Sequence, residues 1–247
     1  MMLKLFIFIA LCVSLTITQD ISLPTSVKTC KRNSDDYSSC LRLAIQESWP
    51  LFVQGIPALN MPPLDPLSTD FMMNDFNFDG VSGKFVVRNA KSYGLARTRF
   101  LSVRPAHAGA RFKLEIDMEI PTIFVEGGFK SDGKVGSFNV VATKGHFNIS
   151  MEDLRATLKL EGPVVNDRWE VQTFSFMPEV GKMKIWASDL FNGNEELNKA
   201  ALTFINEFWK VLYEGMLPTV SKTWNNYWRD FVNEYIFSKI SFSKTFP

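Results

Sequence analysis

Apolar and polar residues repeat with two different periods along the chain. Between Asp36 and Val53, apolar residues recur every three or four positions, which predicts an amphipathic helix. From Phe71 to about Trp186 the period is two, which is typical of strands with one buried and one wet face. From Asn194 to about Lys239 the helical period returns. The order of helix, strands and long helix predicts an α+β fold.

The strand region predicts one long antiparallel sheet. Its clearest strand is Arg111–Ile120, where polar and apolar residues alternate without exception. Ser131–Lys134 has the composition of a hairpin tip, and Arg104–Gly109 that of a turn. Successive alternating segments with closely spaced turns predict a meander with one apolar face.

The C-terminal stretch predicts one very long helix, or two helices that join at Pro218. Asn194 is a suitable N-cap for it. About 45 helical residues would span about 65 Å, whereas a compact domain of this size is about 45 Å across. We therefore expect a helix kinked at Pro218 in an elongated body. Its polar stripe, opposite the apolar face, includes Lys199, Thr203, Asn206, Lys210, Glu214, Lys222, Asn225, Arg229 and Asn233.

A strongly curved sheet wrapped around this helix would bury the apolar faces of both. Such a tube retains an apolar cavity if the side chains do not fill it, and apolar cavities accept apolar ligands. Gly55 ends the first helix, and the prolines from Pro57 to Pro66 predict a rigid, extended segment close to polyproline geometry.

The N-terminus predicts export. In residues 1–18, Lys4 precedes an apolar run that is too short to span a bilayer, which indicates a secretory signal peptide; a membrane anchor is the alternative. Residues 19–247 are then one domain, since no linker or low-complexity segment divides them. Apart from Cys12 in the leader, only Cys30 and Cys40 occur. We expect them to form a disulfide in an oxidising compartment, with two free thiols as the alternative.

Composition and motifs argue against several function classes. The formal net charge of +1 does not suit an electrostatic nucleic-acid binder. The chain lacks the common motifs of hydrolases, phosphate loops and dinucleotide sites. Glu115, Asp117 and Glu119 share one face of a strand, which predicts a solvated surface. His107 and His146 are the only histidines and neither lies near a cysteine, so we expect no metal site, no cofactor and no catalysis.

One modification site stands out in the strand region. Asn148-Ile149-Ser150 is an N-glycosylation sequon. The alternation places Asn148 on the face opposite Phe147 and Ile149, so we expect Asn148 to point outward.

Several segments together resemble the insect juvenile-hormone-binding and takeout-like proteins. They are the pair Cys30 and Cys40, Cys40-Leu41, Gly55-Ile56-Pro57, Pro63-Leu64-Asp65-Pro66-Leu67, Gly127-Gly128-Phe129, Asp132-Gly133-Lys134, Leu190-Phe191-Asn192-Gly193-Asn194-Glu195-Glu196-Leu197 and Phe204-Ile205-Asn206-Glu207-Phe208-Trp209. The resemblance covers the whole mature chain. It implies a tubular lipid-binding fold with a long helix wrapped by a curved antiparallel sheet, an internal apolar tunnel, and a Cys30–Cys40 disulfide.

The resemblance implies a terpenoid or fatty-acid-like ligand. Members often carry a tyrosine where Phe129 stands here. Phenylalanine cannot hydrogen-bond a polar ligand group, which argues against juvenile hormone itself and favours a plainer apolar molecule.

The leading interpretation is a secreted, monomeric, non-enzymatic carrier of a small hydrophobic ligand, without stable membrane insertion. The expected lining residues are Leu114, Ile116, Phe129, Phe204 and Phe208, with Phe52 and Ile56 at the tunnel mouth. The alternatives are a secreted interaction or effector protein whose tunnel is filled by its own side chains, and a secreted hydrolase that uses His107 or His146.

Overall fold

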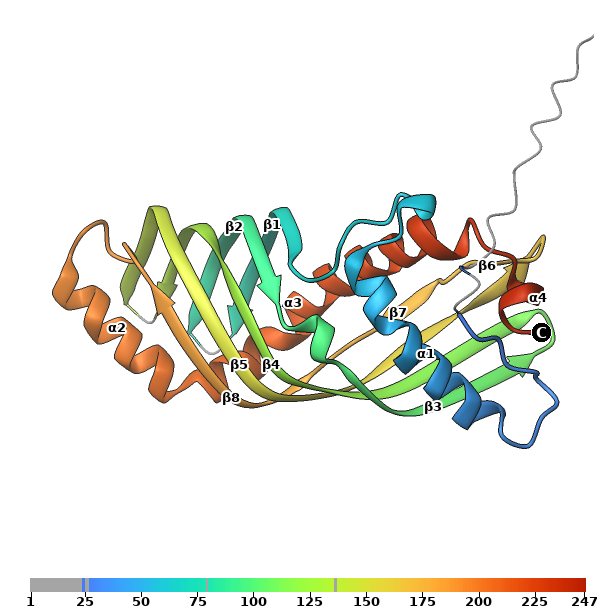
Figure 1. Cartoon of the computed structure of the whole chain (residues 1–247). Helices are drawn as coiled ribbons and strands as arrows, with labels where there is room; N and C mark the ends of the chain where they lie inside the picture. The colour runs from blue at the N-terminus through green and yellow to red at the C-terminus, as the bar shows by residue number, and fades with distance from the viewer. Residues whose placement is uncertain (1–23, 25–26, 79, 136) are drawn as a thin grey trace, which may run out of the picture.

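A computed structural model describes residues 24, 27–78, 80–135 and 137–247. The signal peptide predicted for residues 1–18 lies outside them. The protein is an elongated α+β molecule built on a curved eight-stranded sheet (Figure 1), which confirms the predicted class. The strands are β1 (Leu67–Phe78), β2 (Val81–Tyr93), β3 (Arg99–Ala108), β4 (Arg111–Val135), β5 (Phe138–Val165), β6 (Arg168–Trp169), β7 (Thr173–Ser175) and β8 (Glu179–Ala187).

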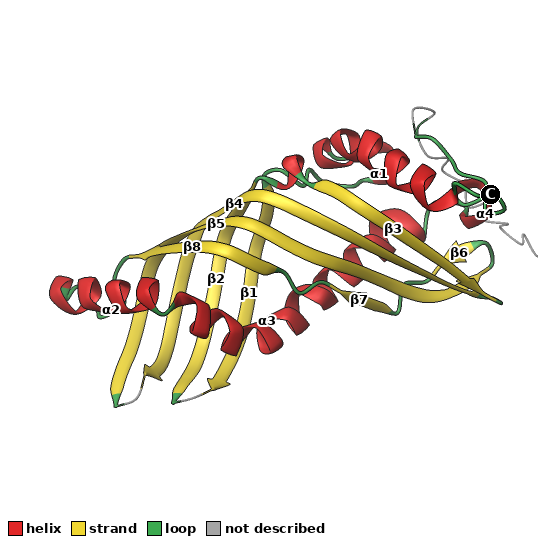
Figure 2. Ribbon diagram, turned by 90° about the horizontal axis from the view of Figure 1, so that it is seen from below, coloured by secondary structure: helices red, strands yellow, loops and turns green. Residues whose placement is uncertain are grey.

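Three main helices accompany the sheet. Helix α1 (Tyr37–Gln54) lies against β3, while α2 (Glu195–Glu207) and α3 (Trp209–Val232) follow one another along the sheet (Figure 2). The shorter helical elements are η1 (Pro57–Leu59), η2 (Leu95–Arg97), a π-helical turn η3 (Asn233–Phe237) and α4 (Phe242–Thr245).

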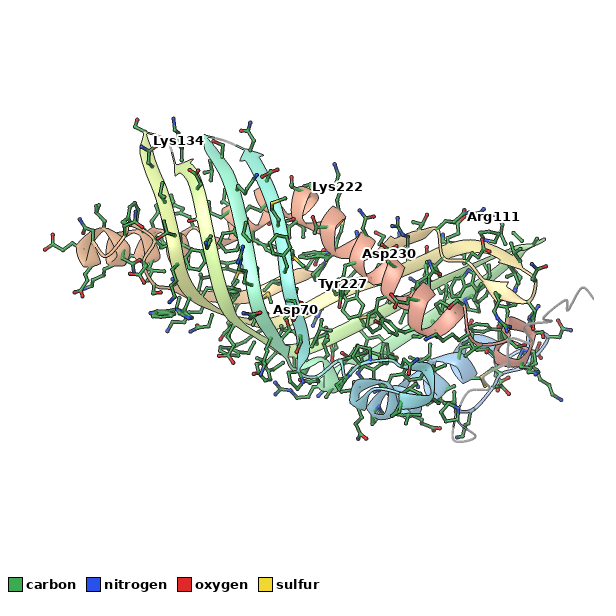
Figure 3. All side chains as sticks on the ribbon, turned by 90° about the horizontal axis from the view of Figure 1, so that it is seen from above. Asp70, Arg111, Lys134, Lys222, Tyr227 and Asp230 are labelled. Carbon is green, nitrogen blue, oxygen red and sulfur yellow. A yellow bond between two sulfur atoms is a disulfide. The ribbon has the colours of Figure 1, made fainter. Side chains whose placement is uncertain are left out.

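The two longest strands divide the sheet into two halves. Strands β4 and β5 are 25 and 28 residues long and pair with each other; on its outer edge β4 meets β3 and then β2, and β5 meets β8, β7 and β6. We call the part with β1, β2 and β8 the wide half and the part with β3, β6 and β7 the narrow half. Every pairing is antiparallel, but the order is not a simple meander, because β3 and β2 share one edge of β4. Lys134 and Arg111 mark the opposite ends of β4 (Figure 3).

The residues of β4 that point inward change from even-numbered to odd-numbered positions where the halves meet. In the narrow half the buried residues of β4 are even-numbered, from Phe112 to Ile120, whereas in the wide half they are Ile123 and Phe129. The change occurs at Pro121 and at Asp153 on the neighbouring strand, whose φ of 55° lies in the left-handed region. One irregular step on both strands thus keeps apolar side chains inside along the whole length.

The narrow half is a closed hydrophobic core. Phe112 is fully buried at its centre, in contact with the rings of Trp169 and of Phe242 and Phe246 from the C-terminal end. Helix α1 covers this core with Tyr37, Leu41 and Ala44. Little room for a ligand is left where aromatic rings pack at this density.

Asp167, in the turn after β5, attaches the C-terminal end to this core. Its carboxylate accepts hydrogen bonds from the Ser241 hydroxyl, from the Ser243 backbone N–H at 2.7 Å and from the Ser243 hydroxyl at 3.1 Å. These bonds, the one from Ser241 first, hold the pKa of Asp167 below its ordinary value.

Asp167→Asn should therefore remove part of the acid sensitivity of the fold. A depressed carboxyl pKa stabilises the native state above the unfolded pKa of about 3.9, and this stability is lost as the pH falls through the lower native value. In urea unfolding between about pH 5 and pH 2.5, we expect a shallower decline for the variant than for the wild type. If the unfolding free energies of the variant and the wild type decline equally with pH, Asp167 does not contribute to the acid sensitivity of the fold.

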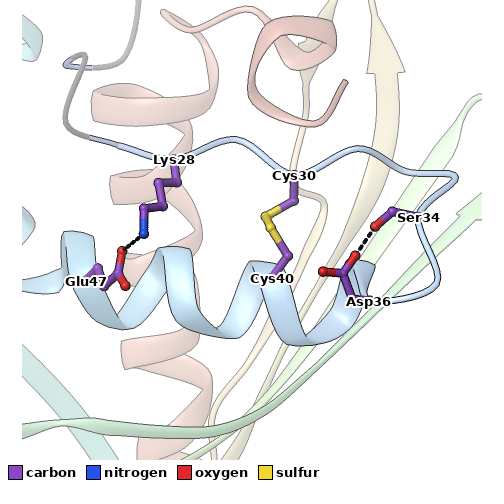
Figure 4. The surroundings of a disulfide bond; sticks show 6 residues. All are labelled: Lys28, Cys30, Ser34, Asp36, Cys40 and Glu47. Atoms are coloured by element: carbon purple, nitrogen blue, oxygen red, sulfur yellow. Dashed lines mark hydrogen bonds and ion pairs between the residues drawn. A yellow bond between two sulfur atoms is a disulfide. The ribbon is translucent and has the colours of Figure 1, made fainter.

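The disulfide predicted between Cys30 and Cys40 is present (Figure 4). It attaches the N-terminal segment to the first turns of α1, beside an ion pair between Lys28 and Glu47 at 2.8 Å. Helix α1 itself has the predicted bounds within one residue.

Two predictions of local structure are wrong, one for the segment after the first helix and one for the C-terminal helical stretch. The proline-rich segment is not extended: Pro57–Leu59 form a 3-10 turn, and Ile56 pairs with Met61 across it. The C-terminal helix continues through Pro218, which lies inside α3, so the alternative of two helices that join at Pro218 is wrong. The interruption is at Phe208, with φ −106° and ψ 17°, where the chain passes from the edge of β8 toward β7 and β1.

Two predicted turns are also wrong, because their residues lie within strands. Ser131–Lys134 belong to β4, and residues 104–108 belong to β3. Gly133 does not form a turn but lets β4 lie close to β2, because a Cβ there would lie 2.6 Å from the Ser82 carbonyl oxygen of β2.

Candidate ligand-binding site

The inner surface of the wide half is apolar but incompletely packed. Its buried members are Ala90, Phe129, Ala142, Phe147, Ala187 and Leu190, three of them alanines, and most of its other members stay partly exposed. These partly exposed residues come from four strands and from α2: Phe85, Val87, Val125, Ile149, Ile185, Ala201, Leu202 and Ile205. The difference from the closed narrow half locates the accessible apolar surface in the wide half.

The C-terminal helices connect the two edges of the wide half. Strand β8 contacts α2 and α3 at one edge, and β1 contacts α3 at the other. In the second contact the Thr223 hydroxyl donates a hydrogen bond of 2.6 Å to the side-chain oxygen of Asn74, a buried residue of β1. Sheet and helices therefore surround the partly exposed apolar surface.

Asparagine side chains hold the helices to the edge of the sheet. Asn206 accepts a hydrogen bond from the Ile185 N–H at 2.8 Å and donates one to the Ile185 carbonyl at 2.7 Å, as a neighbouring strand would. Asn233 does the same at Val171. Asn198 bridges Ala187 and Leu190, and Asn225 accepts from Phe176 N–H. We call this set of contacts the amide seam.

The amide seam gives Asn206, Asn225 and Asn233 a role that the polar stripe alone did not predict. They lie on the polar stripe as predicted, but this stripe borders the unpaired backbone of the sheet edge. The sequence signal that was missed is the recurrence of asparagine, with its paired donor and acceptor, instead of lysine or glutamate at these positions.

Asn206→Leu should weaken the seam measurably. The variant leaves the N–H and C=O of Ile185 without partners beside the helix, which we expect to cost about 1–3 kcal/mol of unfolding free energy in urea. The control is Asn226→Ala on the outside of α3, where the change should stay within about 0.5 kcal/mol. Equal losses in the two variants would show that the seam contributes nothing specific.

Phe204 and Phe208 lie on the helix beside Ala201 and Ile205, which pack against the inner surface of the wide half. Their rings contact each other, with centroids 4.9 Å apart, yet each side chain is 45% exposed. Among the residues of α2 none is buried, and in α3 only Ser221 and Phe231 are. Helix α2 therefore packs on the sheet through Ala201 and Ile205 and leaves Phe204 and Phe208 largely exposed.

Phe129 occupies the packed part of the wide half. Its ring stacks on Phe85 at 5.3 Å and meets Phe147 at 6.2 Å, and the residue is buried. Gly145 on β5 makes this possible, because a Cβ there would lie 2.3 Å from the Phe129 ring. The residue offers no hydrogen-bonding group in this region.

The other predicted lining residues lie outside the wide half. Leu114 and Ile116 are buried in the narrow core. Ile56 is buried and Phe52 partly buried in a cluster with Leu59, Leu64 and Phe231, between α1 and the end of α3. The structure thus places Phe129 in the packed part of the wide half, leaves Phe204 and Phe208 exposed at the helices, and separates the other four from them.

The charged and histidine residues form no catalytic arrangement with one another in the described part of the chain. Asp117 accepts hydrogen bonds from Arg104, Ser102 and Thr157 on the outer face of the sheet, which lower the pKa of its carboxyl group, with Arg104 the largest cause. His107 packs on Phe112 at 4.4 Å, with its Nε2 3.3 Å from the Tyr37 hydroxyl, and burial lowers its pKa. The acidic residues of this strand therefore lie on the outer face of the sheet, as predicted.

A groove of about 650 Å³ lies between β8 and α2, next to the amide seam. Its lining includes Lys184, Trp186, Asn198, Lys199 and Asn206. Trp186 points away from the inner surface, since its neighbours Ile185 and Ala187 supply the inward positions of β8.

None of the described helices is long and apolar enough to cross a membrane.

Comparison with known proteins agrees with this architecture. The circadian clock-controlled protein daywake of Drosophila yakuba is 25% identical over 209 residues, which cover 81% of this chain and 79% of daywake. The Drosophila melanogaster protein of the same name is 25% identical over 215 residues, with the same coverage. Takeout 1 from Epiphyas postvittana superimposes with a TM-score of 0.72 at 21% identity, covering 88% of this chain and 98% of Takeout 1, and so shares the fold.

The family assignment rests on nearly the whole sequence. The sequence model of the haemolymph juvenile hormone binding proteins matches residues 6–247. Such coverage includes both halves of the sheet and the C-terminal helices. The chain belongs to the haemolymph juvenile hormone binding protein family.

Proposed function

We propose that the protein is a secreted, non-enzymatic carrier that holds a small hydrophobic ligand in the wide half of the sheet. The family is one of ligand-binding proteins. The single observation that carries the proposal is the uncovered apolar surface shared by the wide half and α2. Phe204 and Phe208 remain 45% exposed beside it, while the narrow core is closed.

The size of the hydrophobic effect is sufficient for useful affinity. A ligand of about fifteen carbons gains about 12 kcal/mol when its methylene groups leave water, at about 0.8 kcal/mol each. Ordering and loss of free motion oppose this by at least about 4 kcal/mol. Micromolar binding, about −8 kcal/mol, is therefore within reach without any polar contact.

The proposed lining differs from the original expectation. Phe204 and Phe208 line the site together with the partly exposed inner residues Val87, Val125 and Ile149. Phe129 closes one side of the site as part of its packed aromatic cluster. Leu114 and Ile116 support the narrow core instead, and Ile56 and Phe52 support the junction with α1.

A fluorescent fatty-acid probe tests the proposal. We expect saturable binding at one probe per chain, with the blue shift of an apolar environment, and displacement by an unlabelled terpenoid or long-chain fatty acid. Binding that never saturates, or that no apolar competitor displaces, would contradict a defined carrier site.

The aromatic cluster of Phe85, Phe129 and Phe147 favours a second candidate. These rings already occupy part of the wide half, and further closure would leave no site. The protein would then be a secreted interaction or effector protein. Saturable binding to a protein partner, in a preparation that takes up no apolar probe, would favour this candidate over the carrier.

A further inference from the structure

We propose that Asn148 carries an N-linked glycan whose first sugar rests on Trp186, so that the glycan covers the outside of the seam between β8 and α2. The inference rests on the secretory route that belongs to the proposed function. It does not depend on a ligand inside the wide half.

The register of the sheet brings the two residues together. Asn148 of β5 pairs directly with Trp186 of β8. Phe147 and Ile149, its neighbours in sequence, point inward, so Asn148 and Trp186 share the outer face. Directly opposite residues of an antiparallel pair have Cβ atoms about 5 Å apart, which is the reach of an asparagine-linked sugar ring.

Asn148 has no competing role in the described part of the protein. Its side-chain amide makes no hydrogen bond to another described residue. On its other side it pairs with Glu126, whose carboxylate accepts a hydrogen bond from Tyr93. The amide nitrogen is therefore unengaged on the outer surface, and Trp186 is its aromatic neighbour across the strand pair.

Trp186 has the features of a sugar platform. It is 48% exposed, although it is the largest kind of side chain and is paired with β5 near the C-terminal end of β8. One face of an N-acetylglucosamine ring presents C–H groups, which stack on an indole ring. The groove of about 650 Å³ that Trp186 borders supplies space for the sugars that follow, with Lys184 and Lys199 as hydrogen-bond donors for their hydroxyl groups.

The modification follows the ordinary chemistry of the secretory pathway. The donor is an oligosaccharide linked to a polyisoprenyl diphosphate. The Asn148 side-chain nitrogen loses one proton and forms a bond to C1 of the first sugar, while the bond from C1 to the phosphate oxygen breaks and the lipid diphosphate leaves. Transfer to the chain before β5 is paired makes the partial burial of Asn148 in the folded protein no obstacle.

The test combines two single variants and their double variant in protein secreted from insect cells. Ser150→Ala removes the sequon without changing Asn148, and Trp186→Ala removes the platform. We expect the intact mass of the wild type to exceed the polypeptide mass by an oligosaccharide that an N-glycosidase removes. Loss of the glycan through Ser150→Ala should lower Tm by about 2–4 °C. In the Trp186→Ala background the same loss should change Tm by less than about 1 °C.

Two controls keep the result specific. Ser150→Thr preserves the sequon and should retain both the glycan mass and the wild-type Tm. Phe71→Ala removes another exposed aromatic residue, on the outer face of β1, and should leave the effect of the glycan on Tm unchanged.

Each outcome bears on a separate claim. Secreted protein without the added mass would overturn this inference and leave the carrier proposal intact. A glycan whose effect on Tm is the same with and without Trp186 would overturn the platform. Retention of the chain inside the cells would overturn the secretory assignment, and this inference with it.

Discussion

Phe208→Asp abolishes the binding of apolar ligands and leaves the protein folded. Phe208 contacts Phe204 and is 45% exposed, so a charge there is solvated and leaves the fold intact. A bound ligand would bury this carboxylate against hydrocarbon, which is strongly unfavourable. We expect Kd for a fatty-acid probe to rise at least about 100-fold, equivalent to about 2.7 kcal/mol, in a fluorescence titration.

Two further variants separate this effect from general damage. Phe208→Leu keeps an apolar side chain and should bind within about fivefold of the wild type, a difference of about 1 kcal/mol. Phe71→Asp puts the same charge on the outer face of β1, at a residue that is 57% exposed, and should not change Kd. If Phe208→Asp binds like Phe71→Asp, the site does not lie at the helix face.

Phe112→Ala should have the opposite profile, with a large loss of stability and little effect on the site. Phe112 has no exposed surface and contacts Trp169, Phe242 and Phe246. Truncating a buried phenylalanine at the centre of a packed core costs about 3–5 kcal/mol. For a chain of this length Tm should fall by about 6–20 °C, and the unfolding free energy in urea by the same 3–5 kcal/mol.

The neighbouring strand supplies the control for this prediction. Leu101→Ala on β3 removes an exposed leucine and should change stability by no more than about 0.5 kcal/mol. At low temperature, where Phe112→Ala is still folded, the variant should bind the probe with the affinity of the wild type. A loss of binding that parallels the loss of stability would show that the two halves are not independent.

The two halves of β4 and β5 therefore serve different purposes. The narrow half, with the disulfide, α1 and the C-terminal end, supplies a closed core. The wide half is less completely packed and keeps accessible apolar surface, and the amide seam adds hydrogen bonds to the apolar contacts of Ala201, Leu202 and Ile205 that hold α2 to the sheet. Hydrogen bonds along an edge fix the helix without filling the interior.

The sequence alone predicted the features that depend mainly on neighbouring residues. The alternation in Arg111–Ile120 placed its apolar residues inside, and Asn194 caps α2 by accepting a hydrogen bond from the Leu197 N–H at 3.0 Å. The disulfide followed from the presence of two cysteines in the mature chain. The family resemblance then gave the arrangement of sheet and helix that periodicity alone could not specify.

The rest depended on contacts between residues distant in sequence. Helix α3 passes through Pro218, and the interruption lies at Phe208, between α2, which contacts β8, and α3, which contacts mainly β1 and β7. The phase change at Pro121 and Asp153 is invisible in a pattern read strand by strand. Alternation showed that Leu114 and Ile116 point inward, but it could not distinguish a closed interior from an open one.

Native mass spectrometry of the secreted protein, followed by organic extraction and lipid analysis, tests most directly whether the wide half holds a ligand. We predict a complex with one small apolar molecule per chain, released by extraction and absent from the Phe208→Asp protein. A wild-type protein that arrives empty and also fails to bind the fatty-acid probe would contradict the carrier function.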